Sequence, residues 1–268
     1  MPLRVAIGGF GAIGEAVARR LDQGVEGLAL VAVSARDKAR AEAAIAGFAR
    51  PVPVVPLAQL GEEADIVVEC APAHLLREIA EPALGHGRVV MVLSCGALLD
   101  NFDLVELARR HGGRILVPTG ALLGLDAVTA AAEGAIATVH MITRKPPGGL
   151  IGAPYLEWHR ISMDGLDAPK CVFRGSAGEA ARGFPANVNV AAALALAGIG
   201  PERTTIEIWA DPGVTRNIHK IEVEAEAARF SMQIENVPSA ENPKTGRLTP
   251  LSVVAALKKL TSPLAVGT

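Results

Sequence analysis

Aromatic residues and cysteines are both scarce in this chain of 268 residues. Only 3% of the residues are aromatic although 50% are hydrophobic, so the core must be built mainly from Ala, Val, Leu and Ile. The three cysteines, Cys70, Cys95 and Cys171, lack the spacing of a metal site and cannot all pair with one another. We expect each to be a small buried side chain in a protein of the reducing cytoplasm.

The chain also lacks a strong charge of either sign and a long apolar run. Its formal net charge is −2 and no basic run exceeds a few residues. This charge pattern does not favour binding to nucleic acids or anionic membranes. No uncharged apolar run approaches the roughly 20 residues needed to cross a bilayer. The longest, Val188–Ile199, predicts a buried helix, and the N-terminus enters a strand without the pattern of a secretory leader. We therefore expect no membrane or nucleic-acid partner.

Short apolar strands alternate with helical periodicity through the first half of the chain. The predicted strands are Leu3–Ile7, Leu28–Val33, Ile66–Val68, Val89–Leu93 and Ile115–Val117. The predicted helices are Ile13–Leu21, Asp37–Ala46, His74–Leu84 and Leu104–His111. Because each strand is almost continuously apolar, both faces of the sheet must be covered. This pattern predicts an α/β fold with a Rossmann-type, doubly wound parallel sheet.

The pattern changes near residue 120. The predicted strands are then Thr138–Thr143, Thr204–Trp209, Ile218–Glu226 and Phe230–Glu235, with helices at Leu122–Ala132, Ser176–Arg182 and Val188–Ala197. The last three strands alternate apolar and polar residues, which indicates an open-faced, mostly antiparallel sheet with one wet face. Two prolines and two glycines predict a loop over Arg144–Gly149. We expect a dinucleotide-binding domain at 1–120, a second α+β domain for substrate and dimerisation at 121–247, and a C-terminal helix within 248–268 that returns to the first domain.

A glycine-rich fingerprint lies directly after the first strand. It reads Gly9-Phe10-Gly11-Ala12-Ile13-Gly14 and opens a helix, which is the context a dinucleotide site requires. Gly9 permits the tight turn, Gly11 lets the pyrophosphate approach the backbone, and Gly14 allows close packing of helix on strand. The sequence therefore predicts NAD or NADP as cofactor.

Other cofactor contacts are expected where later strands end, because open α/β sheets bind ligands at that edge. Ser34 and Arg36 follow the second strand. Ser34 can bond a hydroxyl or a phosphate, and Arg36 could stack on adenine or meet a 2′-phosphate, so the choice between NAD and NADP stays open. Asp37 could serve only as a helix cap. Small residues that would let a planar ring approach closely follow the later strands, namely Cys70, Ala71, Ser94, Gly120 and Ala121.

The segment Asp211–Ile221 carries the polar groups needed to hold a carboxylate and move a proton. It places Arg216, Asn217 and His219 within four residues. Hydride leaves the Cα of an amino acid only when its amine is deprotonated, so a base with a pKa near neutrality is useful, and histidine suits it best. In a strand, Asn217 and His219 share one face, whereas Arg216 points to the other face or sits in a preceding turn.

Six ordered segments resemble the L-aspartate dehydrogenase family. They are GGFGAIG (8–14), GALLGLDAV (120–128), TRKPP (143–147), FPANVNVAAALALAG (184–198), ADPGVTRNIHKI (210–221) and ENVPSAENPKTGRLTPLS (235–252). The resemblance implies a homodimer that reversibly oxidises L-aspartate to iminosuccinate, which hydrolyses to oxaloacetate and ammonia or feeds NAD biosynthesis. It assigns the catalytic role to His219 and cofactor contacts to Ala121, Leu123 and Asn189. Arg216, Asn217, Arg144 and Lys145 are the local candidates to bind the two substrate carboxylates.

Two other functions remain open from the residues alone. A reductase of a cyclic imine such as dihydrodipicolinate has a similar architecture, but it would show paired histidines followed by a lysine, and no His-His pair occurs here. A non-catalytic dinucleotide sensor would need the fingerprint without the polar segment. The other five histidines lack comparable polar neighbours and are expected at the surface or at helix caps, namely His74, His86, His111, His140 and His159. The segment Asn242–Gly246 could be a plain turn or could cover the active site.

Overall fold

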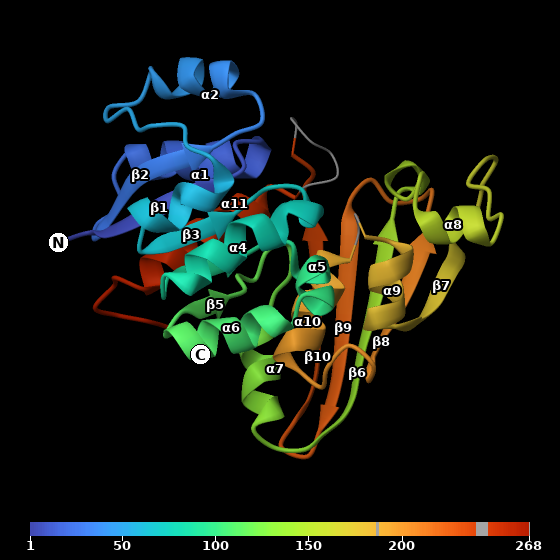
Figure 1. Cartoon of the computed structure of the whole chain (residues 1–268). Coiled ribbons are helices and arrows are strands. Elements are labelled where there is room, and N and C mark those ends of the chain that lie inside the picture. The colour runs from blue at the N-terminus through green and yellow to red at the C-terminus, as the bar shows by residue number, and fades with distance from the viewer. Residues whose placement is uncertain (186–187, 240–245, 268) are drawn as a thin grey trace. The chain divides into compact units, whose positions relative to one another are not determined.

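The computed structural model describes residues 1–185, 188–239 and 246–267, which form two compact units (Figure 1). Unit 1 contains Met1–Pro118 and Pro250–Ala265, and unit 2 contains Thr119–Thr249 with the last residues from Val266 onward. The chain therefore leaves unit 1 after Pro118 and returns to it at Pro250. None of the helices in the described part of the chain is both long and apolar enough to cross a membrane.

Unit 1 is built on a five-stranded sheet in the order β2-β1-β3-β4-β5, and every neighbouring pair is parallel. Its strands are β1 (Leu3–Gly8), β2 (Leu28–Ser34), β3 (Ile66–Glu69), β4 (Val89–Val92) and β5 (Arg114–Leu116). The central strands are buried over most of their length. This confirms the Rossmann-type parallel sheet predicted from continuous apolar strands.

The helices of unit 1 largely follow the predicted pattern. They are α1 (Ala12–Asp22), α2 (Lys38–Ile45), α3 (Leu60–Glu63), α4 (Leu76–Gly85), α5 (Cys95–Asp100), α6 (Asp103–His111) and, from its third residue onward, α11 (Leu248–Lys259), with 3₁₀ turns η1 (Leu57–Gln59) and η2 (Ala73–Leu75). Asp37 caps α2 by accepting a hydrogen bond from the Arg40 N–H. From α11, Val253, Val254 and Leu257 are buried in the same apolar core as β1. The last helix of the chain thus completes the core of the first unit.

Unit 2 carries a second five-stranded sheet, in the order β10-β9-β6-β8-β7. Its strands are β6 (Ile136–Lys145), β7 (Lys170–Ser176), β8 (Thr204–Ala210), β9 (Asn217–Ala225) and β10 (Arg229–Asn236). The β6–β8 pair is parallel and the other three pairs are antiparallel. The sheet is therefore mixed and mostly antiparallel, as predicted. The helices of this unit are α7 (Leu125–Ala132), α8 (Pro154–Trp158), α9 (Ala177–Gly183) and α10 (Asn189–Ala197).

Two predicted boundaries in unit 2 were wrong. Arg144 and Lys145 do not begin a loop, because β6 continues through both and pairs them with Trp209 and Ala210 of β8. The irregular segment begins only at Pro146, ahead of the 3₁₀ turn η3 (Pro147–Gly149). Helix α7 begins at Leu125, three residues later than expected, after Gly124 in the left-handed conformation.

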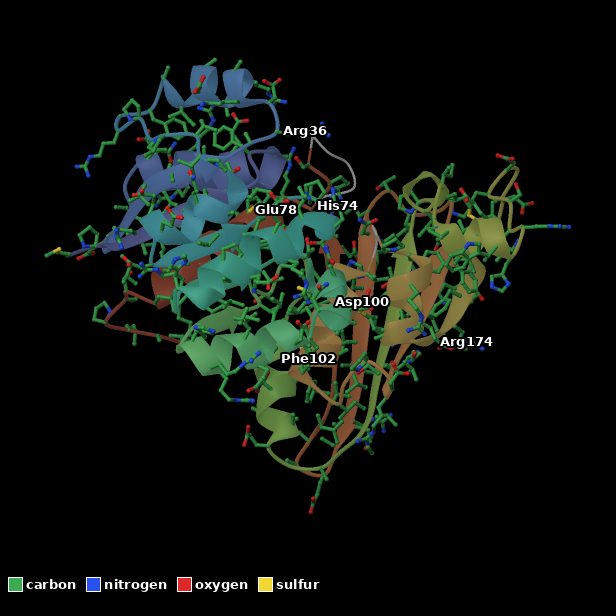
Figure 2. All side chains as sticks on the ribbon, viewed as in Figure 1. Arg36, His74, Glu78, Asp100, Phe102 and Arg174 are labelled. Carbon is green, nitrogen blue, oxygen red and sulfur yellow. The ribbon has the colours of Figure 1, made fainter. Side chains whose placement is uncertain are left out.

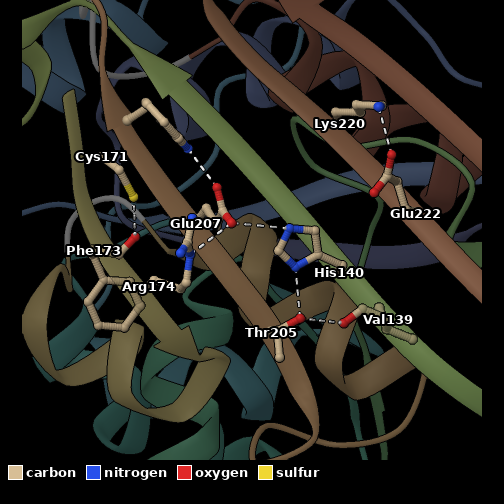
Figure 3. Close-up of polar contacts among 10 residues, drawn as sticks. Val139, His140, Cys171, Phe173, Arg174, Thr205, Glu207, Lys220 and Glu222 are labelled. Carbon is tan, nitrogen blue, oxygen red and sulfur yellow. Dashed lines mark hydrogen bonds and ion pairs between the residues drawn. The ribbon is translucent and has the colours of Figure 1, made fainter. Parts of the chain in front are cut away.

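The two faces of the second sheet differ in character. One face carries Val139, Met141, Ile221 and Val223, which are buried in a core with side chains of α7, α9 and α10. The other face carries a polar network (Figure 3). There Glu207 pairs with Arg174 and lies 3.8 Å from His140, whose Nδ1 is 2.8 Å from Thr205 Oγ1. His140 therefore does have polar neighbours, contrary to expectation, because pairing of β6 with β8 brings Glu207 beside it. Residues 242–245 of the segment Asn242–Gly246, predicted as a turn or an active-site cover, lie outside the described residues.

Candidate active site

The glycine fingerprint forms a turn that only glycine fits at two positions. Gly9 has a φ of +105°, and a Cβ there would lie 2.7 Å from the backbone N of Ala71. A Cβ on Gly14 would lie 1.9 Å from the carbonyl oxygen of Gly9. Gly11 differs, because nothing lies within 4 Å of a Cβ placed there. The turn is thus tightly packed at Gly9 and Gly14, but space remains beside Gly11. That space lies ahead of the first N–H groups of α1, where a pyrophosphate would bind.

The end of β2 carries a hydroxyl, a cation and an acid that caps the following helix. Ser34 is buried at the last position of the strand, and Arg36 is exposed on the loop that follows (Figure 2). The carboxylate of Asp37 is engaged by the Arg40 N–H as the cap of α2. Asp37 therefore acts as a cap here, and the residues near an adenosine ribose would be Ser34 and Arg36.

The expected ring-side contacts of unit 1 gather around a carboxylate that sequence reasoning missed. The Cys70 N–H donates to the Gly8 carbonyl over 2.7 Å, which holds the end of β3 beside the fingerprint. Ser94 donates to Glu69 through its backbone N–H at 2.9 Å and its hydroxyl at 3.0 Å. The sequence feature that could have indicated this carboxylate is that Glu69 is a single charged residue directly after the apolar run Ile66-Val67-Val68.

In unit 2 the Gly120–Gly124 segment is tied to the last strand of the sheet. The side-chain amide of Asn236 donates to the carbonyl of Ala121 over 2.7 Å. Leu123 is half-buried in the same segment. Asn189 is the first residue of α10 and is exposed. Asn236 is a further residue that the sequence argument did not single out.

Five polar residues occupy one end of the buried face of the second sheet: Thr143, Lys145, Asn217, His219 and Asn236. We call them the polar cluster. Thr143 lies directly opposite His219 in the β6–β9 ladder, and Asn217 lies opposite Asn236 in the β9–β10 ladder. Lys145 follows Thr143 on the same face because side chains two apart in a strand point the same way. The same alternation places Asn217 on the face of His219, as predicted.

His219 is held as a neutral imidazole. Its side chain is almost wholly buried, and Nδ1 is 3.0 Å from Oγ1 of Thr143. Burial, and secondly the positive charge of Lys145, lower the pKa of His219 to about 3. This value is well below the near-neutral pKa that the sequence argument sought, because the argument could not include burial. Lys145 is also buried, and burial lowers its pKa to about 8.

The two arginines considered for substrate binding lie elsewhere. Arg144 alternates with Lys145 and points to the opposite face of β6, where Nη1 pairs with Asp211 Oδ2 at 3.1 Å and the guanidinium stacks over Trp209. Asp211 Oδ1 also accepts the Gly213 N–H at 2.9 Å, so this pair fixes the turn before β9. Arg216 sits in that turn, just before β9, and is exposed. The structure thus brings Lys145, Asn217 and His219 together on one face and places Arg144 on the other, while Arg216 is exposed in the turn before β9.

Comparison with known proteins identifies the family of both units. Residues 126–260 match the family profile described as "Aspartate dehydrogenase, C-terminal". The chain is 61% identical over 266 residues to an L-aspartate dehydrogenase from Bradyrhizobium diazoefficiens, covering 99% of this chain and 94% of that protein. The chain belongs to the aspartate dehydrogenase family. Within it, "L-aspartate dehydrogenase 3" from Bordetella bronchiseptica is 58% identical, covering 99% of this chain and 98% of that protein.

The likeness extends to the cofactor unit and to the fold. Residues 9–118 match the profile described as "Homoserine dehydrogenase, NAD binding domain", so this aspartate dehydrogenase family member carries an NAD(P)-binding unit. The crystal structure of aspartate dehydrogenase from Thermotoga maritima superposes with a TM-score of 0.74 at 25% identity, and all of both chains is covered. The fingerprint turn and the polar cluster therefore both lie within residues that these comparisons cover.

Proposed function

We propose that this protein catalyses the reversible, NAD(P)-dependent oxidation of L-aspartate to iminosuccinate, which water converts to oxaloacetate and ammonia. The observation that carries the proposal is the polar cluster, where a neutral histidine and a lysine share the buried end of a face. The family membership of the whole chain supports the same substrate. The reaction removes a hydride from Cα and one proton from the α-ammonium, so the Cα–N single bond becomes the C=N bond of a protonated imine.

His219 takes the proton that must leave the substrate's α-ammonium. In the tautomer that serves this step, Nδ1–H donates to Oγ1 of Thr143, and Nε2 keeps its lone pair for the incoming proton. The amine that results can then push its lone pair toward Cα as the bond to hydrogen breaks. A bound nicotinamide cofactor supplies the two-electron acceptor. In the reverse direction the protonated His219 acts as the general acid.

Lys145 is the cation best placed to bind a substrate carboxylate. It lies on the face of His219, and Asn217 lies there too and can donate its side-chain amide. A carboxylate beside Lys145 offsets the positive charge that helps to depress the pKa of His219. Substrate binding thereby raises the basicity of His219 at the moment it is needed. Arg144 contributes by fixing the turn that carries Arg216, which is left as a candidate for the second carboxylate.

We also propose that the protein is a cytoplasmic homodimer and that its imine product feeds NAD biosynthesis. The three cysteines are free, which suits a reducing compartment. The cofactor contacts proposed are the fingerprint residues, Ser34 and Arg36 on the adenosine side, and Cys70, Ala71, Ser94, Gly120, Ala121, Leu123 and Asn189 on the ring side.

The decisive experiment is a substrate panel with both cofactors. Purified protein should reduce NAD or NADP with L-aspartate, and oxidise the reduced cofactor with oxaloacetate plus ammonia. His219→Ala should lower kcat by about 10²–10⁴-fold, the usual value of general acid–base assistance, while the Kd of NADH stays within about twofold of the wild type.

The matched control is His111→Ala, which removes an exposed histidine at the end of α6. It should behave as wild type. Turnover of a cyclic imine in place of aspartate would favour the rival reductase. Tight NADH binding without turnover of any amino acid would favour a dinucleotide sensor.

A further inference from the structure

Glu69 is a wholly buried carboxylate that the proposed reaction does not use. It ends β3 at the carboxyl edge of the parallel sheet with no exposed surface. Burial raises its pKa, and hydrogen bonds to the carboxylate act against that rise. Among the described ion pairs none involves Glu69, so no nearby cation explains its place. Burying an acid without a neighbouring cation is costly, so Glu69 is expected to have a role that offsets this cost.

The donors around Glu69 come from two separate loops. Oε2 accepts the backbone N–H groups of Leu93 at 3.0 Å and Ser94 at 2.9 Å, and Oε1 accepts the Ser94 hydroxyl at 3.0 Å. The backbone N–H of Ala71 supplies a fourth hydrogen bond from the loop after β3. Three of these four donors are peptide N–H groups, which can only donate and never accept a hydrogen bond. The carboxylate therefore ties the loop after β3 to the loop after β4.

The first of these loops also touches the fingerprint. The Cys70 N–H donates to Gly8, and the Cys70–Ala71 peptide lies against Gly9 so closely that a Cβ there would meet it at 2.7 Å. Glu69 thus sets the positions of the peptides that follow β3 and β4, and the first of these abuts the fingerprint turn. In an open parallel sheet, the ligand lies along this edge. The adenosine half of a bound dinucleotide would lie toward β2, and the ring half toward β3 and β4.

We propose that Glu69 is a positioning residue for the nicotinamide half of the dinucleotide. It acts through the Cys70–Ala71 and Leu93–Ser94 peptides, and none of its described hydrogen bonds goes to the end of β2. This inference rests on the cofactor part of the proposed function and is independent of the amino-acid substrate. Its signature is a loss of affinity confined to ligands that carry the nicotinamide ring.

The test compares two ligands on the full-length protein. In Glu69→Gln the side chain keeps its size, but its NH₂ group faces peptide N–H donors and cannot accept from them. The Kd of NADH, followed by fluorescence titration, should rise about tenfold, the size expected when a hydrogen bond to a charged group is lost. The Kd of ADP-ribose, measured by calorimetry, should stay within about twofold. The matched control Glu63→Gln makes the same change at an exposed residue of α3 and should leave both values unchanged.

An equal effect on both ligands, or none on either, would overturn the proposal. Failure of wild-type protein to bind NADH would instead remove the cofactor function itself, so the two failures are distinguishable. If Glu69→Gln does not fold, Ser94→Ala decides the matter by hydrogen exchange. Losing the Ser94 hydroxyl should speed exchange of the Cys70 and Ala71 amides, because Glu69 transmits the change. Unchanged exchange at those two amides would contradict the link.

Discussion

Lys145 and His219 illustrate how burial sets the roles of two titratable side chains at once. Both lie at the end of an otherwise apolar face, and both have their pKa lowered by loss of water. For His219 the result is an imidazole that is neutral across physiological pH. For Lys145 the result is an ammonium that stays charged at neutral pH but loses its proton in mildly alkaline solution. The same environment therefore prepares a base and a switchable cation.

Lys145 makes the affinity for aspartate depend on pH. Below its pKa of about 8 the side chain is charged and can bind a carboxylate, and above that value it is neutral. The KM for L-aspartate should therefore rise as pH increases through about 8. In Lys145→Arg the guanidinium stays charged, so that rise should be absent across the same range. In Lys145→Met the KM should be about 10- to 100-fold higher at neutral pH, as expected for a lost hydrogen bond to a charged group.

The thermal stability of Lys145→Met separates binding from folding. Its Tm, measured beside KM, shows whether a rise in KM reflects lost carboxylate binding or partial unfolding. A KM profile for the wild type that stays flat through pH 8 would argue against Lys145 as the carboxylate ligand.

At the scale of elements, two glycines in the turn between β1 and α1 have different roles, one in the fold and one in ligand binding. Gly14 is required by the fold, since a Cβ would overlap the Gly9 carbonyl, whereas the space beside Gly11 is open. Gly14→Ala should lower the free energy of unfolding by about 3 kcal/mol. Gly11→Ala should leave it within about 0.5 kcal/mol of wild type yet weaken NADH binding about tenfold or more. Thermal unfolding and NADH titration of both variants check this, and equal stability losses would contradict it.

The sequence predicted most elements because their apolar periodicity is regular. β1, α1 and β2 begin and end within one residue of prediction. β7 was missed because its register shifts between Cys171 and Phe173, which places two consecutive buried residues in the strand and breaks the alternation. α5 was missed because Ser94-Cys95-Gly96 has the composition of a turn.

The site was only partly predictable for a related reason. The parity of one strand was enough to place Asn217 with His219. Thr143 joins His219 from 76 residues away, and Asn236 reaches Ala121 across 115 residues. Pairing between strands far apart in the sequence determines these contacts, and local periodicity does not predict that pairing.

At the scale of the whole molecule, the last helix of the chain stabilises the first unit. Leu257 of α11 is fully buried in the core of unit 1, and Leu251 on the same helix is 63% exposed. Leu257→Ala should lower the free energy of unfolding by about 2–5 kcal/mol, and Leu251→Ala by less than about 0.5 kcal/mol. Hydrogen exchange should show faster opening of β1 and β3 in Leu257→Ala. Faster opening of β6 and β9 alone would contradict the assignment of α11 to this core.

The path of the chain also has a consequence for synthesis on the ribosome. The strands of unit 1 are made first, but the side chains that complete its core lie beyond Pro250. While unit 2 is translated, the core of unit 1 in the nascent chain therefore lacks the side chains that α11 contributes. Unit 2 has no such delay, because its sheet and its core helices are contiguous from Thr119 to Asn236. The residues that form the core of unit 2 are thus all synthesised before those that complete the core of unit 1.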